Sequence, residues 1–236
     1  MNPNSQISAL VERFTTQLES YQQSSYLETQ TRREFIDPFF IALGWDVANE
    51  QGYAEAYKDV IHEDALKIGR ATKAPDYSFR IGGLRKFFLE AKKPSIQIKN
   101  NAEAAFQVRR YGWSAKLPLS ILTNFAELAV YDCRIKPLKT DNAAIGRILY
   151  LTYTDYLQRW DELLGLFSRE AILKGAFDKY IDSKTHKKGT AEVDTAFLTE
   201  IERFCSRLAR NIALRNPFLT SRQLNFAVQQ TIDRII

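Results

Sequence analysis

The stretch KAPDYSFRIGGLRKFFLEAKK, residues 73–93, decides the fold, because it places charged residues at the ends of an otherwise apolar β-hairpin. Two apolar runs flank Gly82 and Gly83, and glycine supplies the positive φ that a tight hairpin loop needs. Asp76 opens the first run, and Glu90 and Lys92 close the second. Buried charges are costly unless they are paired or bind a ligand, so this placement points to a functional site.

The register of the hairpin depends on the length of its loop. A two-residue loop would pair Ile81 with Leu84, whereas a three-residue loop would pair Ile81 with Arg85. The second register puts all of the hairpin's apolar residues on one face, namely Tyr77, Phe79, Ile81, Phe87, Leu89 and Ala91. Because register follows burial, we predict the three-residue loop. Asp76 then lies opposite Glu90, with the two Cβ atoms roughly 4.5 to 5.5 Å apart.

This register has a chemical consequence. Two carboxylates that close repel each other unless one is protonated or a cation lies between them. Oxygen ligands suit a hard divalent ion such as magnesium. Lys92 lies on the same face as Glu90, where it can orient or help to deprotonate a water molecule. The pattern predicts metal-assisted hydrolysis of a phosphodiester, although an isolated Glu-X-Lys is more often a solvated pair on the open face of a sheet.

The next segment, NNAEAAFQVRRYGWSA at residues 100–115, predicts a helix that begins at Asn100 or Asn101 as its cap. Gln107 and Tyr111 are four residues apart and therefore share one helix face. They could contact a phosphate or a base edge beside the metal. The alternative is a helix that simply packs Tyr111 onto the sheet, with Gln107 at its edge.

Further strands and helices surround the hairpin. A first strand is expected at about residues 60–66, and LPLSILTNFAELAVYDC predicts two strands around a turn at residues 123–126. Helical periodicity covers residues 5–24 and a segment ending at Gly44, in which Pro38 predicts a kink or break near Asp37. The order of strand, hairpin, helix and two strands predicts a small α/β core.

From about Thr152 the sequence changes to long amphipathic helical patterns joined by the polar segment DSKTHKKGTAE. We therefore predict an α/β domain over residues 1–150 and a helical connector region over residues 151–236. The apolar helical pattern at the end, NFAVQQTIDRII, has no stop signal, which favours a continuing polypeptide or a partner.

Composition narrows the class of protein. The hydrophobic fraction is 45% and the charged fraction 26%, which is typical of a globular domain. The formal charge is +5 and its surplus lies in residues 134–236, which allows a polyanionic partner. Two cysteines cannot form a disulfide framework, and neither histidine lies near a cysteine pair. With no signal peptide and no long apolar span, we expect a cytoplasmic protein that does not contact a membrane.

The motifs together resemble a known superfamily. Asp76 after proline, Glu90-Ala91-Lys92 and Gln107-X-X-X-Tyr111 resemble the PD-(D/E)XK nucleases, in the branch with a Gln-X-X-X-Tyr motif. TRREFIDPFFIALGWDV, FFLEAKKP and FSREAILKGAFDKY are similar to the amino-terminal portion of the fused type IIG restriction-modification enzymes. This resemblance runs from about Glu28 to Ile236.

The resemblance implies a restriction-endonuclease-like core with a mixed central sheet flanked by helices, followed by an α-helical region. It implies that Asp76 and Glu90 are metal ligands, that Lys92 is the catalytic lysine, and that Gln107 and Tyr111 assist at the scissile phosphate. A glutamate on a helix before the core often completes such a metal site. Glu28 and Glu34 are equal candidates for this position, and Glu63 on the first strand is a third.

The implied cofactor is Mg²⁺, for which Mn²⁺ may substitute, and the implied substrate is double-stranded DNA. Target recognition would come from a methyltransferase and target-recognition module, in cis or in trans, and a double-strand break would need two copies or transient dimerisation. Two alternatives stay open. The same site could act on branched DNA, or the chain could be a catalytically inactive DNA-binding or scaffolding domain with the same fold.

Overall fold

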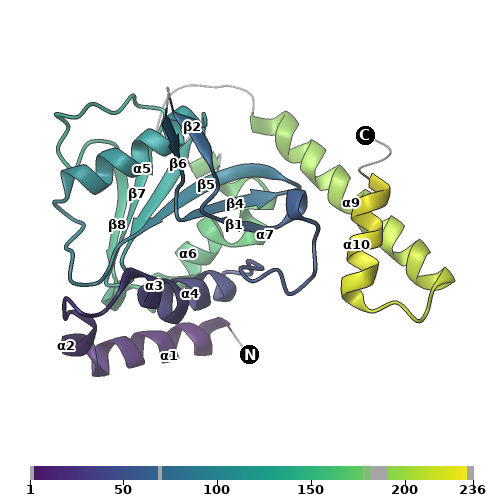
Figure 1. Ribbon diagram of the computed structural model, residues 1–236, viewed down its shortest axis with the longest axis horizontal. Coiled ribbons are helices and arrows are strands. Elements are labelled where there is room, and N and C mark those ends of the chain that lie inside the picture. Colours follow the sequence, from purple (N-terminus) through teal and green to yellow (C-terminus); the bar gives the residue numbers. More distant parts are fainter. Residues whose placement is uncertain (1–2, 69–70, 178, 181–190, 233–236) are drawn as a thin grey trace.

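A computed structural model describes residues 3–68, 71–177, 179–180 and 191–232 (Figure 1). Its centre is a six-stranded sheet with the order β1-β4-β5-β6-β7-β8. The strands of this sheet are β1 (Val60–His62), β4 (Tyr77–Ile81), β5 (Leu84–Ala91), β6 (Leu119–Thr123), β7 (Glu127–Asp132) and β8 (Arg147–Thr152). β5 and β6 run parallel and the other neighbours run antiparallel, so the sheet is mixed, as predicted.

Helices flank this sheet and continue after it, which confirms the predicted fold class. The first group is α1 (Pro3–Thr16), α2 (Leu18–Tyr21), α3 (Glu28–Thr31), the π-helix η1 (Arg32–Ile36), α4 (Asp37–Ala42) and the short 3₁₀ helix η2 (Glu55–Tyr57). The second group is α5 (Ala102–Ser114), η3 (Tyr153–Asp155), α6 (Trp160–Phe167), α7 (Arg169–Leu173), α9 (Ala191–Arg215) and α10 (Ser221–Ile232). In Figure 1, α9 and α10 lie to one side of the sheet, away from α1.

The two faces of the sheet pack differently. Along β5, Phe87, Leu89 and Ala91 join a large core with helices α1, α4, α6 and α7. The alternate residues, which include Phe88 and Glu90, point to the side of α5, because successive strand residues face opposite ways. This alternation directs Glu90 away from the aromatic core and towards the helix that carries Gln107.

The β4-β5 hairpin combines the two registers that were weighed. At its base, Tyr77 pairs with Leu89 and Phe79 with Phe87, as predicted. At its tip, Ile81 pairs with Leu84, so the prediction of a three-residue loop that pairs Ile81 with Arg85 was wrong. A β-bulge between Phe79 and Arg80 absorbs the one-residue difference. The bulge lets Gly82 and Gly83 form a two-residue turn, both at positive φ, without moving the apolar face.

Several other local predictions hold. The helix pattern before Gly44 is interrupted by the π-helix η1, and Pro38 lies in the first turn of α4. Gly44 ends that helix at a φ of +88°. Asn101 is the cap of α5, since its side chain accepts a hydrogen bond from the Ala104 amide at 3.0 Å.

Some elements were missed or differ in length. The expected strand at residues 60–66 is β1 alone, and residues 66–68 instead form β2 (Leu66–Ile68), which pairs only with β3 (Ala71–Lys73). The sequence did not predict β3 or β8. The pattern after Thr152 divides into two short helices, because Ser168 is extended and caps α7. The polar segment at residues 182–192 lies largely outside the described residues.

The core crosses the predicted division at residue 150. Side chains after that position join the large core of the sheet, namely Tyr156, Trp160, Leu163, Phe167, Ile172 and Phe177. The two-part division stays a prediction, and the sheet's own core extends to Phe177.

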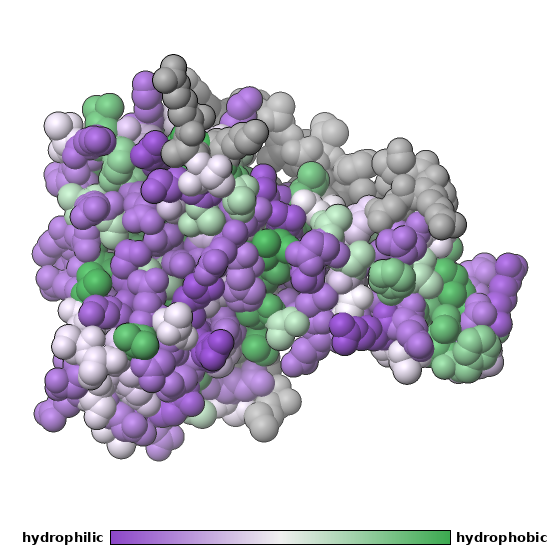
Figure 2. Space-filling model, viewed as in Figure 1, coloured by the Kyte–Doolittle hydropathy of each residue, from purple (hydrophilic) through white to green (hydrophobic). Residues whose placement is uncertain are grey.

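Within the described residues no helix is long and apolar enough to cross a membrane. Figure 2 shows hydrophobic residues gathered around α9 and α10, where Leu214 and Phe218 are among the most exposed apolar side chains.

Candidate active site

The base of the β4-β5 hairpin brings the first two predicted residues together. The register Tyr77–Leu89, continued by one residue, sets Asp76 opposite Glu90. Asp76 is fixed there by β5, since its Oδ2 accepts a hydrogen bond from the Ala91 amide at 2.7 Å. The side chain of Asp76 keeps 17% of its surface exposed, so this carboxylate lies at the edge of the cluster that opens to solvent.

Glu90 is the buried member of the pair, with 4% of its surface exposed. Its Oε1 accepts hydrogen bonds from Lys92 Nζ at 2.9 Å and from Gln107 Nε2 at 2.6 Å. Its Oε2 is buried and has no hydrogen-bond partner among the described residues. Burial, followed by the charge of Asp76, raises the pKa of Glu90 to about 7. Protein groups thus donate hydrogen bonds to only one of the two oxygens of this buried carboxylate.

Lys92 follows β5 and points back along it. Its Nζ donates to Glu90 Oε1 at 2.9 Å and to the Ala91 carbonyl oxygen at 2.8 Å. Burial alone would lower the pKa of Lys92, but the carboxylates of Glu90, Glu28 and Asp76 outweigh it and raise the pKa above its usual range. The ammonium group is thereby held against the acidic cluster.

Helix α5 supplies the two polar residues that the sequence placed on one face. Gln107 Nε2 donates to Glu90 Oε1 and also lies 3.1 Å from Tyr111 Oη. Burial raises the pKa of Tyr111. These contacts continue the chain of hydrogen bonds from Lys92 through Glu90 to α5, so four of the five residues predicted as catalytic are linked by their side chains. Asp76 is held beside them through the Ala91 amide.

The three glutamates that were candidates to complete the metal site lie in different surroundings. Glu28 Oε2 lies 4.0 Å from Lys92 Nζ, and burial raises the pKa of Glu28. Glu34 instead interacts with Tyr26, whose pKa rises through burial and through this neighbouring carboxylate. Glu63 is 75% exposed at its side chain and lies 3.7 Å from Arg32 NH1. The structure brings Glu28 into the cluster and leaves Glu34 outside its contacts, a difference that helical spacing did not reveal.

Arg32 also lies in the site, and the sequence did not single it out. Its NH1 lies 3.4 Å from Asp76 Oδ1, and its guanidinium stacks over the Tyr77 ring at 4.9 Å from the centroid. The only signal in the sequence was its position four residues after Glu28, which places both on one helix face.

The donor set suits a hard divalent cation. No group of three or more His, Cys, Asp or Glu side chains arranged for a metal occurs within the described residues. Magnesium, however, is commonly bound through one or two carboxylates, with water and substrate phosphate completing its shell. Asp76 and Glu90 provide two carboxylates, and the unpartnered Glu90 Oε2 is the type of oxygen that such an ion would satisfy. The residues present therefore fit the ion that the sequence implied.

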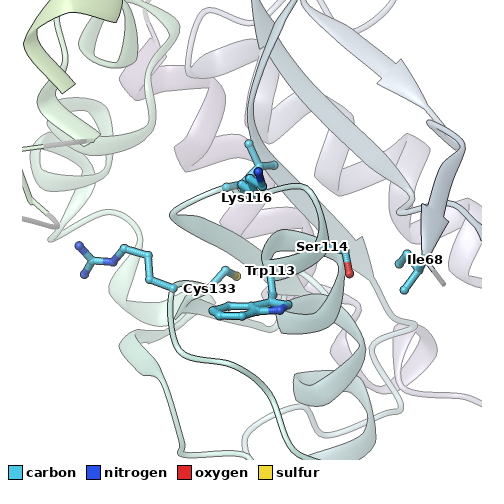
Figure 3. A pocket seen from close by; sticks show the side chains of 7 residues that line it. Ile68, Trp113, Ser114, Lys116 and Cys133 are labelled. Atoms are coloured by element: carbon cyan, nitrogen blue, oxygen red, sulfur yellow. The ribbon is translucent and has the colours of Figure 1, made fainter. Parts of the chain in front are cut away.

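A well-formed cavity of the described residues lies in a different place. It has a volume of about 660 Å³ and lies around the C-terminal end of α5 (Figure 3). Its lining residues are Ile68, Trp113, Ser114, Lys116, Leu117, Cys133 and Arg134. None of the predicted site residues lines it.

Comparisons with known proteins show what the chain is similar to. Residues 58–138 match the family described as the type I restriction enzyme R protein N terminus. The matched segment contains all five residues that were predicted as catalytic. The whole chain is 38% identical over 238 residues to the type II restriction enzyme and methyltransferase RM.Eco57I of Escherichia coli. The chain covers 24% of that relative's length. No solved structure matches the chain significantly.

Proposed function

We propose that this chain, which corresponds to the N-terminal region of a restriction-modification enzyme, is a magnesium-dependent DNA endonuclease domain. The observation that carries the proposal is the pair of facing carboxylates, with Glu90 buried, half-satisfied and hydrogen-bonded to Lys92 and Gln107. A purely structural cluster would be expected to satisfy both oxygens of a buried carboxylate, because an unpaired buried acceptor is destabilising.

In this mechanism Asp76 and Glu90 would hold Mg²⁺, or Mn²⁺ in its place, between the ends of β4 and β5. The bound ion would polarise the phosphodiester and favour ionisation of the attacking water. Glu28 is the helical glutamate best placed to take part, since it lies within 4.0 Å of Lys92 Nζ.

The chain's own residues would then orient the reactants. The Lys92 ammonium can donate to the attacking water or to a phosphate oxygen while Glu90 holds it in place. Gln107 is fixed between Glu90 and Tyr111, so the polar edge of α5 faces the site where the phosphate would lie. In this proposal the cluster contacts the metal and the phosphate, so sequence specificity would come from a recognition module elsewhere in the longer enzyme, where a methyltransferase module is also expected.

The test is cleavage of supercoiled plasmid by the purified chain with Mg²⁺, with Mn²⁺ and with EDTA. We expect nicking in either metal and none in EDTA. Calorimetric titration with Mn²⁺ should show binding that Asp76→Asn removes. Metal binding without nicking of plasmid or of branched DNA would favour an inactive DNA-binding or scaffolding domain. A folded wild-type protein that neither binds Mn²⁺ nor nicks DNA would refute the proposal.

A further inference from the structure

Arg32 makes several contacts at the site, and those with Asp76, Glu63 and His62 are long. Its NH1 lies 3.4 Å from Asp76 Oδ1 and 3.7 Å from Glu63 Oε1. Its NH2 lies 3.4 Å from the Asp76 carbonyl oxygen and 3.4 Å from His62 Nδ1. Charge-assisted hydrogen bonds normally measure about 2.7 to 2.9 Å. The guanidinium is therefore shared among several partners, which include the Tyr77 side chain, and it forms no close ion pair with Asp76 or Glu63.

A second arginine-aspartate cluster in the same protein shows the difference. Asp64 accepts from Arg80 NH2 at 2.6 Å, and from Arg85 Nε and NH2 at 2.7 and 2.8 Å. This is the close, bidentate geometry of a structural ion pair, and the Asp64 side chain is only 8% exposed. Arg32 is also largely buried, with 15% of its side chain exposed, yet it lacks such a pairing.

The position of Arg32 is nevertheless well defined. Its guanidinium carbon lies over the Tyr77 ring, 4.9 Å from the centroid, and this cation–π contact holds the group beside the hairpin. Arg32 begins the π-helix η1, which widens the helix next to the hairpin. Short π-helical segments within α-helices are often found at functional sites. The guanidinium is thus held beside the hairpin, although neither Asp76 nor Glu63 forms a close ion pair with it.

Charge gives a reason for such a donor. The carboxylates of Asp76, Glu90 and Glu28 gather around Lys92, which is already bonded to Glu90 and to a backbone carbonyl. An approaching DNA phosphate would meet an excess of negative charge. A guanidinium is well suited to bind it, because its planar fork matches two phosphate oxygens.

We propose that Arg32 is a phosphate-binding residue, whose guanidinium donates to the nonbridging oxygens of a DNA phosphate beside Asp76 and Glu90. This inference rests on the proposed function, since it names a DNA contact of the same site. It adds a residue from the helix before the sheet to the residues of β4, β5 and α5.

The test measures DNA binding without cleavage. A labelled DNA duplex is titrated with the full chain in EDTA at several KCl concentrations, and fluorescence anisotropy gives the association constant. The logarithm of this constant falls with the logarithm of salt by about 0.9 for each phosphate contact. We expect Arg32→Gln to bind about tenfold more weakly and to lose about 0.9 from this slope. The matched control is Arg33→Gln, the adjacent and exposed arginine, whose slope should stay at the wild-type value.

Arg32→Lys keeps a positive charge against Asp76, so it separates phosphate binding from structural support. We expect it to keep the wild-type slope but to bind DNA more weakly, because an ammonium cannot form the paired bonds of a guanidinium. If Arg32 served only to orient Asp76, neither variant would change the slope. Thermal unfolding establishes that each variant is folded, and Arg32→Lys alone carries the test if Arg32→Gln is not.

Three results would overturn the proposal: an unchanged slope in folded Arg32→Gln, wild-type affinity in Arg32→Lys, or no DNA binding by the wild type at the lowest salt. Plasmid nicking in Mg²⁺ runs in parallel. Nicking by the wild type together with an unchanged slope in Arg32→Gln would refute only the role of Arg32. A reduced slope without any nicking would refute the nuclease and retain Arg32 as a DNA contact.

Discussion

Replacement of Glu90 by glutamine should stabilise the protein while it abolishes cleavage. The folded protein raises the pKa of Glu90 to about 7 from an ordinary value of 4.5, through burial and then through Asp76. A rise of this size means that ionised Glu90 costs about 3 kcal/mol of folding free energy. The cost is absent below the unfolded pKa, grows as the pH rises between the two values, and is complete above about pH 7. Glu90→Gln removes the ionised form, so the stability that this variant gains over the wild type should rise over the same pH range.

The assay is urea unfolding in EDTA, followed by tryptophan fluorescence at about pH 8 and about pH 4. We expect Glu90→Gln to exceed the wild type by up to about 3 kcal/mol at the higher pH and to match it at the lower. Asp132→Asn is the matched control, because Asp132 is also buried on the sheet but is paired with Arg134 at 2.7 Å. This control should gain no stability at either pH. A Glu90→Gln protein no more stable than the wild type at about pH 8 would refute the reasoning.

Two further predictions concern the fold around the site. Burial would raise the pKa of Asp64, but hydrogen bonds from Arg85 and Arg80 outweigh it and lower the pKa to about 2. The lowered pKa stabilises the folded protein at pH values above the pKa that Asp64 has in the unfolded chain, and this stabilisation is lost as the pH falls towards 2. Asp64→Asn should therefore lower the free energy of unfolding by about 2 kcal/mol at neutral pH. In urea unfolding this deficit should shrink on acidification, and a deficit that persists at about pH 2 would contradict the assignment. Gly112→Ala should lower the Tm with a loss of about 1–3 kcal/mol, because an added Cβ would lie 2.5 Å from Cys133 Sγ. An unchanged Tm would show that α5 can move away from the sheet.

The base of the hairpin could be predicted because burial and register impose the same requirement there. Tyr77, Phe79, Phe87 and Leu89 must share a face, and this pairing sets Asp76 opposite Glu90. The tip was not predictable in the same way, since Gly82 and Gly83 favour a two-residue turn that conflicts with that register. A bulge is needed to combine the two-residue turn with the register at the base, and no residue near Phe79 predicts a bulge in the sequence.

The rest of the site depends on contacts between distant segments. Spacing along α5 predicted that Gln107 and Tyr111 share a face, and both lie beside Glu90. Spacing could not rank Glu28 against Glu34, because the π-helix between them changes which residues face the sheet. Arg32 was missed for another reason, because it contacts Tyr77 and Asp76, which are far from it in the sequence.

The central claim is that the cluster around Glu90 cleaves DNA, and a pair of adjacent lysines tests it most directly. Lys92 Nζ contacts Glu90, whereas Lys93 Nζ donates to the Ser24 carbonyl oxygen at 3.2 Å, outside the cluster. Nicking of supercoiled plasmid in Mg²⁺ should fall by about 100-fold or more in Lys92→Met. Lys93→Met, which removes the same charge one residue away, should nick at the wild-type rate. Equal nicking by Lys92→Met and the wild type would contradict the account.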